Sequence, residues 1–148
     1  MNGISRRRAV LLQGAMTFAL SALARAALGS EPVPTGAASE RRWYEAALAM
    51  QRLAVANGDQ AYGAVLVLDG AIVGHGPSRV VALGDSTAHA EREAIRDARH
   101  RLGRASLAGS VLYSTSRPCP ACEAAAAEAG VARMIHGPQL RDAGAPRS

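Results

Sequence analysis

The 148-residue sequence contains no lysine, so all 17 of its basic residues are arginine. This absence excludes a lysine nucleophile, a Schiff-base mechanism and a phosphate-binding loop built on lysine. Aromatic residues make up only 3% of the chain, which disfavours a stacking platform for single-stranded nucleic acid. Hydrophobic residues make up 49%, enough for a buried core, and the length is that of a single domain.

Acidic residues are fewer than basic ones, and the 12 of them leave a net charge of +5 and a pI near 10.2. Such an excess normally points to a polyanionic partner. Four of the arginines, however, lie in residues 1–30, which contain no Asp or Glu. The remainder has 13 arginines against 12 acidic residues and is therefore close to +1. The basic charge thus belongs mainly to the first segment.

Residues 1–30 have the organisation of a bacterial export signal. A basic Ser5–Arg8 stretch precedes an apolar run from Ala9 to Ala24, and small residues typical of a cleavage site follow. The run is shorter than the about 20 residues that a spanning helix needs, so a stable membrane anchor is disfavoured. The arginines resemble a twin-arginine signal, as Arg6-Arg7 or as Arg7-Arg8. We expect export to the periplasm, with residues 31–39 as a linker.

Beyond the linker, helices and strands alternate in a pattern that predicts an α/β fold. Ser39 is the expected N-cap of a first helix that ends at Asn57-Gly58. The order αββαβαβ predicts a sheet of about four strands that opens with a hairpin. The expected segments are strands at 62–68, 71–73, 111–114 and 131–135 and helices at 89–102 and 118–129. Gly74, Gly76 and Pro77 are expected to end the second strand, and residues 138–148 to form an irregular tail.

The only cysteines, Cys119 and Cys122, occur in a Pro-Cys-Pro-Ala-Cys motif at the start of a predicted helix. Their spacing places both thiols on one face, where the helix dipole favours thiolate. A pair of this kind suits a soft divalent metal. It also suits redox exchange or a single disulfide, both permitted in an exported protein.

A second motif, His89-Ala90-Glu91, also begins a helix. One histidine with two cysteines supplies three protein ligands for Zn²⁺, the number found in catalytic zinc sites with an open fourth position. Glu91 is then placed to move a proton between water and a leaving group without binding the metal. Together the two motifs predict a catalytic zinc site made by His89, Cys119 and Cys122, with Glu91 as the catalytic residue.

These motifs resemble those of the cytidine deaminase-like zinc deaminase superfamily. The segment Asp85–Glu91, with Gly63–Val67 and Leu112–Thr115, is most similar to the guanine deaminase and tRNA adenosine deaminase branches, and the resemblance covers residues 40–137. It implies a three-layer αβα sandwich around a mixed sheet. It also implies a zinc-dependent hydrolytic deaminase, in which activated water attacks the amine-bearing ring carbon of a base and ammonia is released.

Three departures from the family pattern bear on the substrate. Ser78 stands where relatives usually carry a substrate-binding Asn, and Arg117 stands where they usually carry Glu. The chain also ends sooner after the fourth strand than its relatives, so we expect part of the substrate wall to be missing or to come from a partner subunit. Family members commonly dimerise, which makes a homodimer an expected partner. A non-catalytic exported zinc-binding domain is an alternative that these departures favour.

A tRNA substrate would require a basic track for phosphates. Arg92, Arg96 and Arg99 share one helix face, but Glu93 and Asp97 are available as intrahelical partners. The near-neutral charge beyond residue 30 and the expected export favour a free nucleobase or nucleoside instead, a purine by resemblance. A tRNA adenosine deaminase-like activity remains an alternative to that substrate class.

Overall fold

In the computed structural model, residues 36–148 are described, so the expected export signal and most of the expected linker lie outside the described residues. The helices are α1 (Ala37–Ala56), α2 (Val80–Leu83), α3 (Ala90–Leu102) and α4 (Pro120–Ala129). The strands are β1 (Gly63–Leu68), β2 (Ala71–Pro77), β3 (Val111–Ser114), β4 (Arg133–His136) and β5 (Arg141–Gly144). The described helices include none that is long and apolar enough to cross a membrane.

The strands form one mixed sheet in the order β2-β1-β3-β4-β5. β1 pairs antiparallel with both β2 and β3, whereas β3 and β4 are parallel and are joined through α4. β5 returns antiparallel to β4. Because β3 and β4 run in the same direction, their carboxyl ends lie at the same edge of the sheet, where Ser114 and His136 are register partners.

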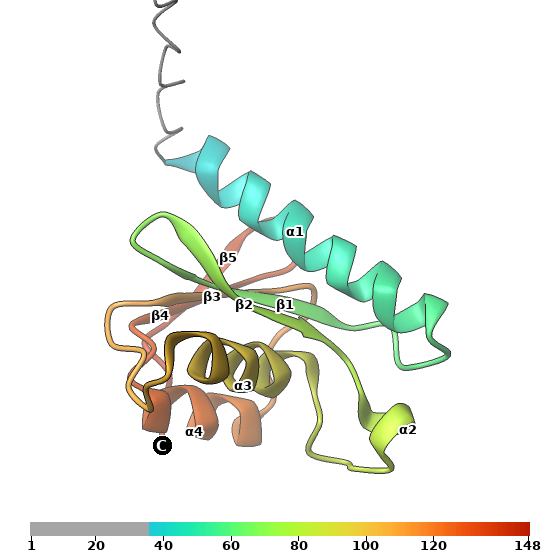
Figure 1. Ribbon diagram of the computed structural model, residues 1–148. Coiled ribbons are helices and arrows are strands. Elements are labelled where there is room, and N and C mark those ends of the chain that lie inside the picture. The colour runs from blue at the N-terminus through green and yellow to red at the C-terminus, as the bar shows by residue number, and fades with distance from the viewer. Residues whose placement is uncertain (1–35) are drawn as a thin grey trace, which may run out of the picture. The chain divides into compact units, whose positions relative to one another are not determined.

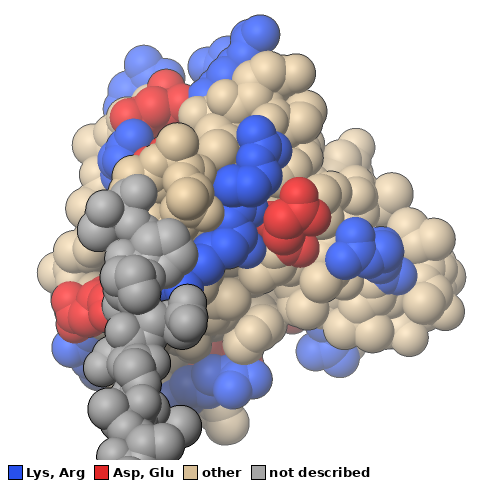
Figure 2. Space-filling view, turned by 90° about the horizontal axis from the view of Figure 1, so that it is seen from above, with Lys and Arg blue, Asp and Glu red and all other residues tan. Residues whose placement is uncertain are grey.

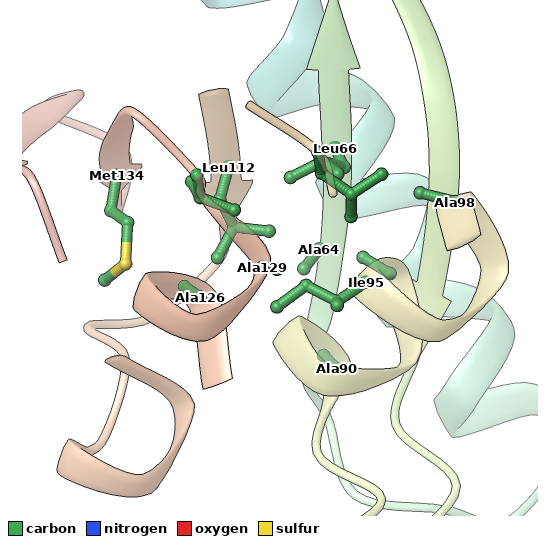
Figure 3. Close-up of a cluster of buried hydrophobic side chains, with 12 residues drawn as sticks. Ala64, Leu66, Ala90, Ile95, Ala98, Leu112, Ala126, Ala129 and Met134 are labelled. Atoms are coloured by element: carbon green, nitrogen blue, oxygen red, sulfur yellow. The ribbon is translucent and has the colours of Figure 1, made fainter. Parts of the chain in front are cut away.

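Helices cover both faces of the sheet, with α1 on one side and α3 and α4 on the other (Figure 1). This confirms the expected three-layer sandwich. Side chains alternate along β1, so Val65 and Val67 pack on the α1 side while Leu66 packs on the opposite side. Figure 3 shows the hydrophobic cluster between the sheet and the helices α3 and α4, which contains Leu66, Ile95 of α3 and Ala126 of α4.

The only tryptophan of the chain, Trp43, lies in α1 and is partly buried against the core on that side of the sheet. Its ring also lies beneath the guanidinium of Arg42, 3.9 Å from the ring centroid. Trp43 therefore occupies an environment made by α1 and by the sheet face that α1 covers.

The second strand is longer than expected, because Gly74 and Gly76 lie inside β2 and do not end it. A Cβ at Gly76 would collide with the carbonyl oxygen of Ala90, and a Cβ at Gly74 with that of Ala94. The two glycines thus allow the backbone of α3 to lie directly on β2. Their role is to allow close packing of a helix on a strand. The sequence pattern predicts that these glycines end the strand, so this role was not expected.

The first helix begins at Ala37, two residues before the expected N-cap. The hydroxyl of Ser39 donates to the carbonyl of Gly36 at 3.0 Å and caps no backbone N–H. Gly36 is the N-cap residue, with a positive φ of 72°. Because alanine has the highest helix propensity, Ala37 and Ala38 extend the helix into the expected linker.

The sheet has five strands where about four were expected, because residues 138–148 are not wholly irregular. β5 pairs with β4 through this segment. Arg133 of β4 donates from Nε to Asp142 of β5 at 2.7 Å, and the N–H of Gly144 donates to the same carboxylate at 2.8 Å. β5 is therefore held by polar contacts and backbone pairing. Its sequence lacks the alternation of apolar and polar residues from which a strand is predicted, which is why it was not expected.

Candidate metal and active site

The three expected metal ligands lie at the starts of two helices that cover the same face of the sheet. His89 is the N-cap residue of α3 and Cys119 is the N-cap residue of α4, both with extended backbone. Pro120 occupies the first turn of α4, where a missing N–H costs no intrahelical hydrogen bond. Cys122 follows within the same turn, so the chain brings both thiols to one helix end.

The distances among these side chains fit a zinc ion. His89 Nδ1 lies 3.7 Å from Cys119 Sγ and 3.5 Å from Cys122 Sγ. In a tetrahedral site with ordinary Zn–N and Zn–S bond lengths, nitrogen and sulfur ligands are about 3.6 Å apart. All three donor atoms lie within 4.8 Å of one another, and both cysteines are free thiols. The donor set and its spacing therefore match a catalytic zinc centre.

Glu91 lies in the first turn of α3, beside the ligands. Its side chain is buried, with an exposed fraction of 6%, and Oε2 lies 3.6 Å from Cys122 Sγ. Burial raises the pKa of the Glu91 carboxyl above its ordinary value, which favours the protonated form. A carboxyl in this position can hold a proton and release it during a reaction.

Burial also raises the pKa of the Cys122 thiol far above its usual range, and the nearby Glu91 carboxylate raises it further. This differs from the expectation that the helix N-terminus would favour thiolate. Cys122 is fully buried, so the loss of hydration outweighs the helix dipole at this position. A thiolate here requires a cation as its partner, which a divalent metal would supply.

A cavity of about 380 Å³ opens beside His89, Glu91 and Cys119. Its other walls include Gln60 and Tyr62 from the segment between α1 and β1. Sequence reasoning missed both residues. Tyr62 is one of three tyrosines in an aromatic-poor chain and directly precedes β1, with an exposed fraction of 47%. Its scarcity and its place at a strand start were the signals that could have identified it.

Ser78, the expected substrate contact, is not among the described residues that line this cavity. Its hydroxyl is buried and donates to Asp59 at 2.9 Å. The same carboxylate accepts the backbone N–H groups of Val81 and Ala82, both at 2.9 Å. Ser78 therefore joins a network that links the start of α2 to Asp59, the neighbour of Gln60 in the cavity wall.

The arginines on α3 are largely paired with acidic groups. Arg96 binds Glu93 within the helix, lies 3.9 Å from Asp85, and donates to Thr87 at 3.2 Å. These contacts attach the helix to the loop that leads to His89. Arg101 pairs with Asp97 at 2.7 Å, and Arg99 lies 3.7 Å from Glu128. Of the predicted face, only Arg96 has an intrahelical ion pair; Arg99 pairs with α4, and no carboxylate of residues 36–148 forms an ion pair with Arg92. Arg101, which follows this face, has its intrahelical partner in Asp97.

The family model for the cytidine and deoxycytidylate deaminase zinc-binding region matches residues 37–137. Among characterised proteins, a tRNA-specific adenosine deaminase of Agrobacterium fabrum is 40% identical over 111 residues, 75% of this chain and 73% of the relative. A guanine deaminase of Bacillus subtilis is 48% identical over 61 residues, 41% of this chain and 39% of the relative. The match therefore spans about two fifths to three quarters of these relatives' lengths.

Solved structures give the same two similarities. One from a study of A-to-I editing by tRNA:A34 deaminases has a TM-score of 0.63 at 41% identity and covers 65% of this chain and 70% of its own. The guanine deaminase of Bacillus subtilis has a TM-score of 0.62 at 35% identity, covering 65% and 62% respectively. The zinc-binding motifs, the fold and the comparisons thus all point to the same family of zinc deaminases.

Proposed function

This chain belongs to the cytidine and deoxycytidylate deaminase zinc-binding family, and from that premise we propose that it deaminates a free purine nucleobase or nucleoside. Membership, the donor set of His89, Cys119 and Cys122 and the adjacent Glu91 establish a zinc-dependent hydrolytic deaminase. The substrate class is the proposal. The relatives include proteins named for tRNA and a protein named for guanine, so similarity alone supports either class.

The observation that carries the proposal is the cavity beside the metal ligands. About 380 Å³ is at the lower end of the range for small-molecule sites. Tyr62 presents an aromatic ring and Gln60 an amide, which suits stacking and hydrogen bonding with a planar heterocycle. A base can thus enter toward Glu91, which is buried and lines the cavity.

The reaction depends on proton transfer by Glu91. His89, Cys119 and Cys122 would hold the metal, which when bound supplies Lewis-acid activation of water. Glu91 Oε2 faces the ligand cluster, so the carboxylate can accept a proton there and deliver it to the departing amine.

The pairing of the α3 arginines supports a small substrate over tRNA. Figure 2 shows the face that α1 covers, where arginine side chains form a band with acidic side chains beside it; this face lies opposite α3 and α4, which carry the metal ligands. On α3, Arg96 and Arg101 are already engaged by carboxylates. A phosphate track would need unpaired cations in a row, because affinity for nucleic acid rises with the number of phosphates neutralised.

The test is a substrate panel with purified, zinc-loaded protein. Ammonia release from adenine, guanine, cytosine and their nucleosides is compared with A-to-I conversion in a tRNA anticodon stem-loop. Turnover of a free purine compound supports the proposal, and conversion of the stem-loop alone overturns it. No turnover of any substrate at full zinc occupancy would favour the alternative of a non-catalytic zinc-binding domain.

We further propose a periplasmic location and a homodimeric state. The first rests on residues 1–30, where the basic stretch and apolar run resemble an export signal. The second rests on the family resemblance, and sedimentation of the purified chain measures it. Export would separate the protein from cytoplasmic tRNA, which agrees with a small-molecule substrate.

A further inference from the structure

Arg117 is the one lining residue of the cavity with a permanent positive charge. It directly precedes Pro118 and Cys119, and its side chain is exposed, whereas Glu91 on the same cavity is buried. Among the described residues, no carboxylate forms an ion pair with Arg117. In contrast, Arg96 and Arg101 of α3 and Arg133 of β4 all have acidic partners. No acidic residue of the described part of the chain therefore competes with a ligand for the Arg117 guanidinium.

The surroundings of Arg117 are also basic. β3 and β4 bring Ser114 and His136 side by side, and Arg141 of β5 is the register partner of His136. The pKa of His136 is lowered by burial and then by the charges of Arg117 and Arg141, which places both arginines near it. Asp142 of β5 binds Arg133, and Glu123 of α4 lies 3.6 Å from Arg147, so neither carboxylate pairs with Arg117.

We propose that Arg117 binds the phosphate of a purine nucleoside monophosphate, so that the preferred substrate is the nucleotide. This inference rests on the proposed small-molecule deaminase function and narrows its substrate class. The base would lie inward beside Tyr62 and Glu91, and the sugar would extend to the exposed end of the cavity. A planar guanidinium there offers two parallel N–H donors to phosphate oxygens. The glutamate that relatives usually carry at this position would repel a phosphate.

The experiment compares nucleosides with their 5′-monophosphates. Wild-type protein is assayed with adenosine and AMP and with guanosine and GMP, alongside Arg117→Gln and Arg117→Glu. We expect kcat/KM to favour the monophosphate by about tenfold or more in the wild type, because hydrogen bonds to charged groups are the stronger ones. Arg117→Gln should remove the preference, mainly through KM, and Arg117→Glu should reverse it. Arg104→Gln, which removes an exposed arginine outside the cavity, should retain it.

Binding gives a second readout that needs no turnover. Isothermal titration with inosine 5′-monophosphate and inosine, both deamination products, should show tighter binding of the phosphate form, lost in Arg117→Gln. Zinc content and circular dichroism confirm that each variant is folded and metallated.

The outcomes separate the two proposals. Equal kcat/KM for nucleoside and monophosphate, or a preference that survives in Arg117→Gln, overturns this inference and leaves the deaminase function standing. Failure to deaminate any base, nucleoside or nucleotide overturns the proposed function, while an Arg117-dependent binding of inosine 5′-monophosphate would still support the phosphate site. An Arg117-dependent activity on the RNA stem-loop, with none on monophosphates, would replace the nucleotide by a polynucleotide and overturn the inference.

Discussion

At the scale of single residues, a buried carboxyl and a buried thiol meet beside the metal ligands. Glu91 Oε2 and Cys122 Sγ are 3.6 Å apart, and burial is the main cause that raises the pKa of each. Burial disfavours the charged form of both groups. The chemistry of the site therefore depends on when the Glu91 carboxyl and the Cys122 thiol lose their protons.

Replacing Glu91 tests its role in proton transfer. Glu91→Gln keeps the size of the side chain and removes its basicity, so we expect kcat to fall by about 10²–10⁴-fold. Zinc content should stay at one ion per chain, because Glu91 is not one of the three ligands. Ammonia release and metal analysis on the same sample measure both. Retained turnover in Glu91→Gln would remove the catalytic assignment.

Metal removal makes stability depend on alkaline pH. Burial, and next the Glu91 charge, raise the pKa of the folded Cys122 thiol above its unfolded value of about 8.5. The unfolded chain then releases its proton first as pH rises, which lowers the stability of the folded state. We expect the reduced, metal-free protein to lose on the order of 1 kcal/mol of unfolding free energy between about pH 8 and about pH 10.

Urea unfolding at several pH values measures this loss. Zinc-loaded protein should lack it over the same range, because metal binding has already displaced the thiol protons. Cys122→Ser is the matched control, and its metal-free form should show a smaller pH dependence. An identical dependence in Cys122→Ser would assign the effect to another group.

At the scale of elements, α3 is the part that positions the chemistry. It begins beside His89, carries Glu91 in its first turn, and lies directly on β2 through Gly74 and Gly76. The contact between Gly76 and the Ala90 backbone lies at the start of the helix. The packing of β2 and the placement of the ligands are thus coupled.

Gly76→Ala tests this coupling. The added Cβ would collide with the carbonyl oxygen of Ala90, so α3 must shift. Overpacking of this kind costs about 1–3 kcal/mol of unfolding free energy. Thermal unfolding should show the loss, and zinc affinity should fall with it because His89 begins the displaced helix. Ala71→Val adds methyl groups at an exposed position of the same strand and should change neither measurement. Equal effects from both variants would contradict the proposed contact.

Much of this arrangement could be predicted from local patterns. The His89–Glu91 and Cys119–Cys122 motifs begin helices in the structure as expected, because spacing and capping chemistry are local properties. β5 could not be predicted, since it is held by backbone pairing with β4 and by the contact of its Asp142 with Arg133 of that neighbouring strand. The place of Gln60 and Tyr62 in the cavity wall depends on which loops meet in space. The sequence marks Tyr62 only by its scarcity and its position at a strand start, and it does not mark Gln60.

At the scale of the whole molecule, the arginines of residues 1–30 belong to the expected export signal, and the other arginines belong to the folded domain. Arg7 belongs to both possible twin-arginine pairs. We expect Arg7→Lys to block or strongly slow export of the full chain from a bacterial cytoplasm, because the pair itself is read by the transport system. Cell fractionation with detection of the shortened mature form measures this. Arg25→Lys, outside the pair, should leave export unchanged, and unimpaired export of Arg7→Lys would contradict the twin-arginine assignment.

Trp43 gives the molecule an optical reporter of its own. As the only indole of the chain, it reports on α1 and its face of the sheet, while the metal ligands belong to α3 and α4 on the other face. Cobalt in place of zinc would add a coloured probe on that second side. Fluorescence and visible absorption, followed during one unfolding experiment, can then show whether the two layers separate in a single cooperative step.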